Sequence, residues 1–226
     1  MFRACLRPGT LAVLRKLQSA NAMRSRSFYL AGGTGLALQL GHRLSDDVDF
    51  FTMQSFELGG LLTLLEKQGG FTVAGMAPGI LHLLFGEAAK ASFLYYPYRL
   101  LFPLLEFDGC PVADYRDIAA MKLVAVGQRG SRKDFVDLYF LLSGKITIRQ
   151  LKSLVEQKFL GIRYSWPHLL RSLGYFADAE DDPPPVLLSA GEERELTPAA
   201  WAQMKEFLLK IQEEALRQIQ IEGRNG

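Results

Sequence analysis

The sequence has few cysteines and histidines and no long apolar run, and each shortage excludes a class of protein. The two cysteines, Cys5 and Cys110, form neither a disulfide framework nor a metal-ligand spacing. This usage is typical of a reducing compartment and predicts a cytoplasmic protein. The longest uncharged stretch, 27–42, holds four glycines, a threonine and a glutamine, so it falls short of the roughly 20 mostly apolar residues of a membrane helix. We therefore expect no membrane span.

Carboxylates are missing from the first fifth of the chain. Residues 1–45 hold no Asp or Glu but seven bases: Arg3, Arg7, Arg15, Lys16, Arg24, Arg26 and Arg43. This arm fits a solvated helix face, a surface that attracts nucleic-acid phosphates, or an Arg-rich transit-like segment. Leu11, Leu14 and Leu17 form an apolar stripe in the arm, which favours a part of the fold over a transit segment. The net charge of the whole chain is only +2, so it does not indicate a polyanion partner.

Disorder is excluded because 49% of the residues are hydrophobic and 22% charged. We predict an α/β (α+β) lobe over 1–110, a small mixed sheet with flanking helices, followed by a helical bundle over 111–226. In the lobe, hydrophobic periodicity predicts helices at 9–24, 34–40 and 56–68, and strands at 28–31, 48–51, 71–73, 80–85 and 91–96. In the bundle, we expect helices that begin near Asp114, Ser131, Thr147, Ser165 and Thr197. The acidic, proline-ended run 178–185 is predicted to be an exposed loop.

A glycine turn followed by paired carboxylates is the most informative feature. A strand that runs through Gly32, Gly33 and Thr34 into a helix lets backbone N–H groups face an anion, because glycine has no Cβ to block a phosphate. Asp47 and Asp49 open the next strand, where alternate side chains share one face. Two adjacent carboxylates repel unless a cation lies between them, so the pair predicts a Mg²⁺ site that bridges nucleotide phosphates.

The same pattern of residues is open to other interpretations. A Rossmann fingerprint fits poorly, because position 38 is Leu and the acids at Asp47 and Asp49 come too early for the ribose contact. The chain also lacks the Gly-Lys-Ser/Thr of a P-loop. The plain structural alternative is that Asp47 and Asp49 lie on a solvated strand edge. Histidines offer no metal site: His42 belongs to the motif, His82 to an apolar strand and His168 to a helix.

Two separated motifs resemble one known family. The segment from Gly32-Gly33-Thr34 through Gly41-His42-Arg43-x-Ser45-x-Asp47-x-Asp49 is similar to the first motif of the AbiEii/AbiGii toxin group. These are nucleotidyltransferases of the DNA polymerase β superfamily. The stretch from Asp117 through Lys122 to Asp134 and Asp137 is similar to the helical motifs of the same group. Together the motifs span residues 29–142.

The second stretch also indicates a functional site independently of the resemblance. The helical neighbours of Lys122 are apolar, so its ammonium group leaves a face that is otherwise expected to be buried. Lys122 either snorkels to solvent or meets nucleotide phosphates in a cleft. Asp134 and Asp137 share a side of the next helix; the alternatives are that Asp134 caps a helix begun at Ser131 and that Asp137 pairs with Lys133.

The resemblance implies a Mg²⁺-dependent nucleotidyltransferase that moves a nucleoside monophosphate from a nucleoside triphosphate to an acceptor, which could be a tRNA or a protein. It implies catalytic roles for Asp47, Asp49, Lys122 and Asp137, with the metal on Asp47 and Asp49. It implies nucleotide binding by Gly32, Gly33, Thr34, Arg43, Ser45, Lys122 and Asp134. As the toxin half of a toxin–antitoxin or phage-defence pair, the protein would have a cognate antitoxin as a partner.

The sequence departs from the superfamily pattern at one place. A third carboxylate is commonly found on a later central strand, and the strand expected at 91–96 has none. Two alternatives therefore stay open: a kinase-like phosphotransferase on the same scaffold, and an inactive nucleotide-binding or interaction module. The position of the α-phosphate label distinguishes transfer from kinase activity.

Overall fold

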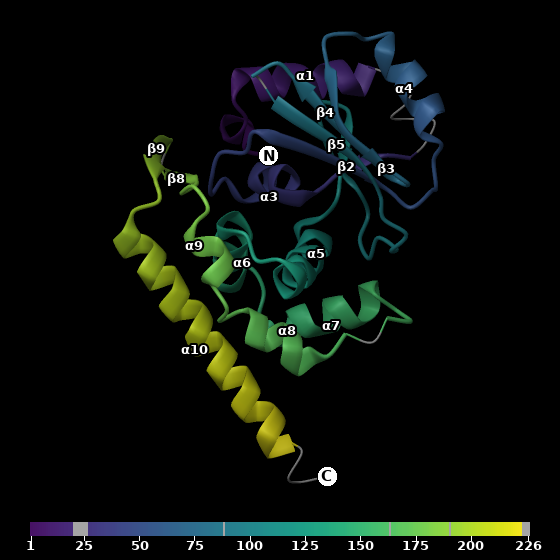
Figure 1. Ribbon diagram of the computed structural model, residues 1–226. Coiled ribbons are helices and arrows are strands. Elements are labelled where there is room, and N and C mark those ends of the chain that lie inside the picture. The colour runs from purple at the N-terminus through teal and green to yellow at the C-terminus, as the bar shows by residue number, and fades with distance from the viewer. Residues whose placement is uncertain (20–26, 88, 163, 190, 223–226) are drawn as a thin grey trace. The chain divides into compact units, whose positions relative to one another are not determined.

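The structure is a computed structural model that describes residues 1–19, 27–87, 89–162, 164–189 and 191–222. Its contacts divide the chain into two compact units, Met1–Ile118 and Ala119–Gly226 (Figure 1). The boundary expected at 110/111 precedes the end of the first unit, Ile118. Helix α5 (Tyr115–Gln128) begins in unit 1 and ends in unit 2.

Unit 1 is built on a mixed sheet of seven strands in the order β3-β4-β5-β2-β1-β7-β6. Its strands are β1 (Tyr29–Leu30), β2 (Asp47–Thr52), β3 (Thr72–Ala77), β4 (Ile80–Phe85), β5 (Ala89–Tyr95), β6 (Leu105–Phe107) and β7 (Cys110–Val112). The central pair β2 and β5 is parallel, as is β1 with β7, and the other neighbours are antiparallel. The predicted mixed sheet is confirmed, and it is larger than expected.

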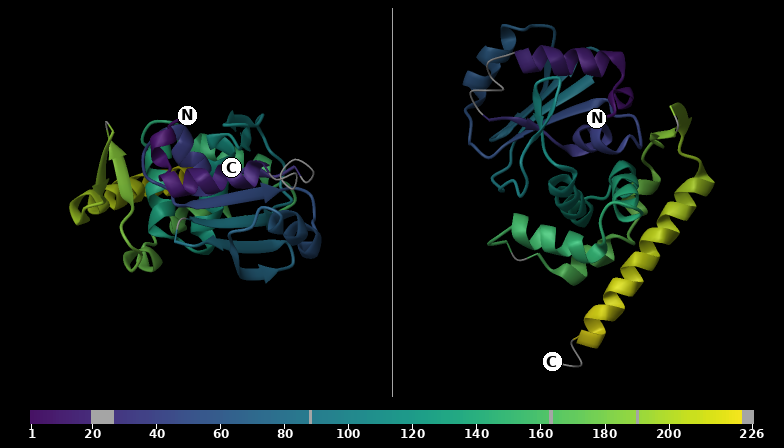
Figure 2. Two further views of the ribbon diagram at one scale, coloured as in Figure 1. Left: turned by 90° about the horizontal axis from the view of Figure 1, so that it is seen from above. Right: turned by 180° about the vertical axis from the view of Figure 1, so that it is seen from behind.

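One face of this sheet forms the core of unit 1. On β2, Val48, Phe50 and Thr52 are buried, whereas the residues between them are half-buried. Helices α1 (Pro8–Ser19) and α4 (Leu58–Glu66) cover the buried face with apolar side chains such as Leu14 and Leu61. Views from above and behind show α1 lying across the strands (Figure 2). Strand alternation thus sends Asp47 and Asp49 to the face opposite α1 and α4.

Local signals account for most elements of unit 1, and the differences have local causes. Helix α3 (Gly32–Leu40) starts two residues before the predicted 34, and β4 matches 80–85. The first predicted helix, 9–24, is observed as α1, and residues 20–24, including Arg24, lie outside the described residues, as does Arg26. The predicted elements do not include strands β6 and β7 or the short 3-10 helix at Arg3–Cys5, and three-residue elements carry no periodic pattern of their own.

Unit 2 is mostly helical. Its further helices are α6 (Arg132–Leu142), α7 (Ile148–Lys158), α8 (Trp166–Ser172), α9 (Ala177–Glu180) and α10 (Pro198–Glu222). Ser131, Thr147 and Ser165 cap α6, α7 and α8 by accepting from a backbone N–H three residues on, as predicted. Thr197 does the same for α10 through the N–H of Ala200 at 3.2 Å. No helix in the described ranges is long and apolar enough to cross a membrane.

Two predictions for unit 2 need correction. The second half is not purely helical, because β8 (Val186–Ser189) and β9 (Glu192–Glu195) form an antiparallel hairpin. The turn between them contains Gly191 with φ +84°, a backbone conformation that glycine adopts without strain. The run 178–185 is not entirely a loop, since its first residues belong to α9, which packs on α6.

Candidate functional site

The glycine turn brings backbone close to one of the paired carboxylates. Gly32 follows β1 with φ +61°, a conformation that residues with a Cβ rarely adopt. A Cβ built on Gly32 would lie 3.0 Å from Asp49 Oδ2. The chain therefore needs glycine at this position twice over, once for the left-handed backbone and once for the space that the Asp49 carboxylate occupies.

The next glycine makes room for a buried arginine. Arg43 is only 1% exposed, and its guanidinium group occupies the space where a Cβ on Gly33 would lie. Its Nη1 donates to the carbonyl oxygen of Leu44 at 2.9 Å. A planar guanidinium group at the first turn of α3 adds positive charge beside the N–H groups of that turn. The predicted nucleotide-binding residues Gly33 and Arg43 are thus in direct proximity.

Two buried hydroxyl groups join α3 to the start of β2. Thr34 Oγ1 lies 2.7 Å from Ser45 Oγ and also donates to the carbonyl oxygen of Asp47. Both side chains are almost fully buried. These bonds fix the carboxylate strand against the glycine turn. The prediction that Thr34 and Ser45 cradle phosphates stays a prediction, and the structure gives both hydroxyls a positioning role.

Asp47 and Asp49 lie on one face of β2 and are both half-buried. Among the described residues, no group of three or more His, Cys, Asp or Glu side chains is arranged to hold a metal ion. Mg²⁺ does not need such a cage, because one or two carboxylates with substrate phosphates and waters complete its octahedral shell. The hard oxygen donors of Asp47 and Asp49 therefore fit Mg²⁺ in the presence of a nucleotide.

The lysine and aspartates of unit 2 form a buried ionic cluster. Lys122 Nζ lies 2.7 Å from Asp134 Oδ1 and 2.7 Å from Asp137 Oδ2. The side chain of Asp137 is fully buried, and those of Lys122 and Asp134 are 10% and 13% exposed. Lys122 therefore does not snorkel to solvent, and its cluster carries one positive and two negative charges.

The structure also decides between the two interpretations of each aspartate. Asp134 lies in the first turn of α6, where its backbone N–H donates to Ser131, but its carboxylate binds Lys122 as well. Asp137 pairs with Lys122. Sequence proximity suggested Lys133 for Asp137, yet Lys122 on α5, fifteen residues earlier, reaches it.

The basic arm is partly neutralised within unit 1. Arg3 and Arg15 bind Asp108 at 2.5 and 2.9 Å, and Arg7 binds Asp46 at 2.9 Å. The hydrogen bond from Arg15 is the main reason that the pKa of Asp108 lies below its usual value. These contacts support a surface helix as the structural role of this part of the arm.

The two thiols are buried and carry no negative charge near neutral pH. Burial raises the pKa of Cys5 to about 11 and that of Cys110 to about 12. Cys5 Sγ donates to the carbonyl oxygen of Ala37 at 3.1 Å. Since the thiolate is the nucleophilic form, neither cysteine is suited to covalent catalysis.

Sequence reasoning missed two polar residues on the strands beside the carboxylates. His82 was assigned to an apolar strand, and Ser92 was passed over because β5 has no carboxylate. In the structure, His82 Nδ1 lies 3.1 Å from Ser92 Oγ. The sequence did hold a signal for both residues. Each is a polar residue within an apolar strand, and side chains alternate between the two faces of a strand.

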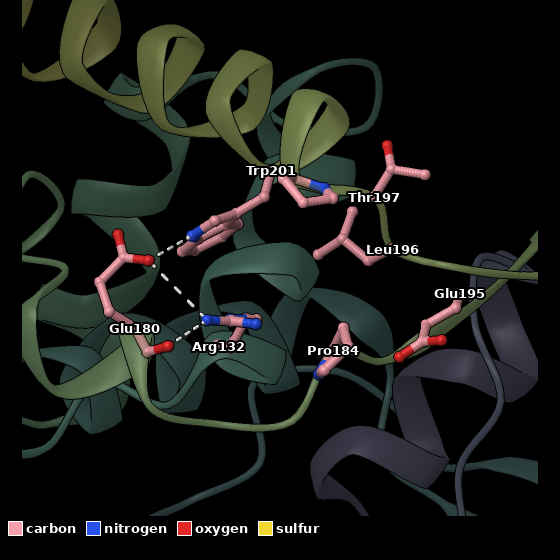
Figure 3. A pocket seen from close by; sticks show the side chains of 8 residues that line it. Arg132, Glu180, Pro184, Glu195, Leu196, Thr197 and Trp201 are labelled. Atoms are coloured by element: carbon pink, nitrogen blue, oxygen red, sulfur yellow. Dashed lines mark hydrogen bonds and ion pairs between the residues drawn. The ribbon is translucent and has the colours of Figure 1, made fainter.

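Unit 2 also contains a pocket of about 550 Å³. Arg132, Glu180, Leu196 and Trp201 line it (Figure 3). Its polar groups bind each other: Trp201 Nε1 donates to Glu180 Oε2 at 3.1 Å, and Arg132 Nε donates to the carbonyl oxygen of Ala179 at 2.9 Å. The pocket is therefore built by contacts that fix α9 against α6 and α10.

A known structure shares this fold. The chain shares the fold of MenT4, a nucleotidyltransferase toxin of Mycobacterium tuberculosis H37Rv, with a TM-score of 0.56 and 17% identity over 92% of this chain and 86% of that one. The fold is that of nucleotidyltransferases, with the carboxylate pair on a central strand of the sheet.

The family follows from the sequence comparison. The profile of the AbiEii nucleotidyl transferase toxin, of a type IV toxin–antitoxin system, matches residues 16–76 and 85–219. The chain belongs to this family, which confirms the resemblance found in the sequence. An uncharacterized protein of Aquifex aeolicus strain VF5 is 39% identical over 160 residues, which cover 69% of this chain and 76% of that protein.

Proposed function

We propose that this protein is a Mg²⁺-dependent nucleotidyltransferase that transfers a nucleoside monophosphate from a nucleoside triphosphate to an acceptor hydroxyl. One observation carries the proposal: Asp47 and Asp49 share a face of β2, with Asp49 packed against Gly32 of the turn that opens α3. Membership of a nucleotidyltransferase toxin family supports the same reaction.

Each group in unit 1 has a physical task in this reaction. Asp47 and Asp49 would hold Mg²⁺, which supplies charge neutralisation on the triphosphate and on the leaving pyrophosphate. The N–H groups of Gly33 and Thr34 at the first turn of α3 would bind phosphate oxygens, with the partial positive charge of the helix end favouring an anion. Arg43 would hold the same turn in shape and add full positive charge.

Lys122 is assigned to the triphosphate on different grounds. The family resemblance places a lysine and aspartates in a helical motif after the sheet, and Lys122, Asp134 and Asp137 form one cluster here. Asp137, fully buried, would orient the lysine, while Lys122 would give up its ion pair with the more exposed Asp134 to bind a phosphate. Lysine suits this role because its ammonium group is a compact charge on a flexible chain.

As a family member, the protein would act as the toxin of a toxin–antitoxin pair, with an antitoxin protein as its partner. We propose the end of a transfer RNA as the acceptor to test first and a protein hydroxyl as the second. The described bases Arg3, Arg7 and Arg15 already bind acids of unit 1, so they contribute less to RNA binding than their number suggests.

The experiment follows the label of the α-phosphate. The protein is incubated with Mg²⁺, each of the four α-³²P nucleoside triphosphates and total transfer RNA, and compared with Asp49→Asn and Asp46→Asn. Asp49→Asn should lower transfer by about 10³-fold or more, because the metal supplies several kcal/mol. Asp46→Asn should transfer normally, since Asp46 only pairs with Arg7 at the surface.

Other outcomes would replace the proposal. Label that moves only from γ-³²P nucleotides would make the protein a kinase-like phosphotransferase. Mg²⁺-dependent nucleotide binding by calorimetry, without label in RNA or protein, would make it a binding module. Equal transfer by the native chain and Asp49→Asn would remove the carboxylate pair from the reaction.

A further inference from the structure

Three polar residues lie in one row across the central strands of unit 1. Asp49 on β2 is paired with Ser92 on β5 in parallel register, and Ser92 is paired with His82 on β4 in antiparallel register. Residues paired across a sheet project to the same face. His82 and Ser92 therefore lie on the face that carries Asp49, and Ser92 is one strand away from it, at a spacing of about 4.8 Å.

His82 and Ser92 lie within hydrogen-bond distance of each other. Ser92 is 3% exposed, and its Oγ lies 3.1 Å from His82 Nδ1, while His82 is half-buried. The next pairs on the same face do not join two polar side chains: Ile80 is opposite Leu94, and Leu84 is opposite Lys90. A buried hydroxyl costs free energy unless it is hydrogen-bonded, so the imidazole fixes the orientation of the Ser92 hydroxyl.

The proposed reaction needs a group that accepts the proton of the acceptor hydroxyl. Asp47 and Asp49 are committed to the metal in that reaction, and β5 holds no carboxylate from Ala89 to Tyr95. Lys90 is a charged residue on the same face of β5. It lies opposite Asp47 in the strand register and is exposed. On this face of β4 and β5, His82 is the residue whose chemistry suits a proton acceptor near neutral pH.

We propose that His82, acting through Ser92, accepts the proton of the attacking hydroxyl; this inference rests on the proposed function. The acceptor oxygen forms a bond to the α-phosphorus, and the bond from that phosphorus to the pyrophosphate oxygen breaks, with its electron pair leaving on pyrophosphate. The acceptor proton passes to Ser92 Oγ while the Ser92 hydroxyl proton passes to His82 Nδ1, which leaves an imidazolium. The 3.1 Å contact carries the second transfer.

The experiment compares three variants of the full chain in the α-label assay. His82→Asn and Ser92→Ala should each lower kcat by about 10²-fold or more, the usual contribution of a positioned base, with an unchanged KM for the nucleotide. The double variant should lose no more than either single one, because the two residues act in series. His168→Asn is the matched control, since the His168 ring contacts the carbonyl oxygen of Gly127 within unit 2.

Two further readouts separate proton transfer from a structural role. The pH profile of kcat should differ between the native chain and His82→Asn, because the variant removes the proposed proton acceptor. Adding Ser92→Asp to His82→Asn places a carboxylate beside Asp49 and should recover at least tenfold of the lost kcat. Failure to recover, or a pH profile of kcat in His82→Asn like that of the native chain, overturns the inference.

Failure of this inference is distinguishable from failure of the proposed function. If Asp49→Asn is inactive but His82→Asn transfers label like the native chain, the nucleotidyltransferase stands and another group accepts the proton. If the native chain transfers no label, the proposed function fails and this inference fails with it.

Discussion

The two clusters of charged residues are built in opposite ways. In unit 1, Asp47 and Asp49 are half-buried on a strand, and a glycine turn that is held by Thr34 and Arg43 shapes their surroundings. In unit 2, Asp137 is fully buried and is held with Asp134 by Lys122. The first cluster depends on backbone conformation, whereas the second depends on charge pairing. Mutations should therefore damage the two clusters through different mechanisms.

The largest loss of stability should come from removing the lysine of the ionic cluster in unit 2. Lys122→Met removes the ammonium group that pairs with the buried Asp137, and breaking a buried pair costs about 3–5 kcal/mol of unfolding free energy. Asp47→Asn in unit 1 should cost under about 1 kcal/mol, as is usual for partly exposed positions. Urea unfolding followed by tryptophan fluorescence measures unit 2, because both tryptophans, Trp166 and Trp201, lie there.

A rescue variant tests the mechanism of this loss. Adding Asp137→Asn to Lys122→Met removes the buried negative charge that had faced Lys122 and should restore part of the stability. The two cysteines lie in unit 1, so labelling of their thiols measures the opening of that unit separately. If thiol labelling and fluorescence shift equally in Lys122→Met, the two units unfold together and the contrast between them is only local.

The second prediction concerns the backbone of the glycine turn. Gly32→Ala forces a Cβ into the left-handed region, at about 1–2 kcal/mol, and pushes on Asp49 Oδ2 at 3.0 Å. We expect a small loss of thermal stability together with a large loss of nucleotide transfer. The matched control is Gly59→Ala in α4, where a Cβ would meet nothing within 4 Å. It should raise stability by about 0.5–1 kcal/mol and leave transfer unchanged, and equal effects of the two variants would contradict this account.

The same contrast explains which parts of the fold the sequence could predict. Helix starts in unit 2 depend on local chemistry, and Ser131, Thr147 and Thr197 were correctly identified as caps. A local signal was overlooked as well: Asp108-Gly109, with φ of +48° and +79°, joins β6 to β7 in a two-residue hairpin. This dipeptide is a strong hairpin signal, so the missed pair was predictable.

The arrangement of the site was only partly predictable. Strand alternation placed Asp47 and Asp49 on one face, which the structure confirms. The burial of Arg43 against Gly33 depends on contacts between separate elements. The row from Asp49 through Ser92 to His82 depends on the register of three strands, two of them far along the chain from Asp49. Register is set by the whole sheet, so no short motif encodes it.

The smallest loss of stability should come from removing surface carboxylates that form ion pairs, and one example is taken from each unit. In unit 2, the hydrogen bond from Lys205 is the main reason that the pKa of Glu180 lies below its ordinary value of 4.5. Folded Glu180 therefore binds its proton more weakly than the unfolded chain does. Its stabilising contribution is present above pH 4.5 and is lost as the pH falls through the lowered pKa.

Glu180→Gln should remove this dependence on acid at a cost of about 0.2–1 kcal/mol at pH 7, because the pair is largely exposed. Unfolding is best followed by circular dichroism. Glu180 accepts a hydrogen bond from Trp201, so the substitution would change the fluorescence of Trp201 directly. In unit 1, Asp108→Asn should act in the same direction, because Arg15 and Arg3 lower the pKa of Asp108. Both ion pairs hold surface segments and neither touches the two charged clusters, so both variants should transfer nucleotide normally. A loss of transfer in Glu180→Gln would instead mean that the pocket around Trp201 takes part in the reaction.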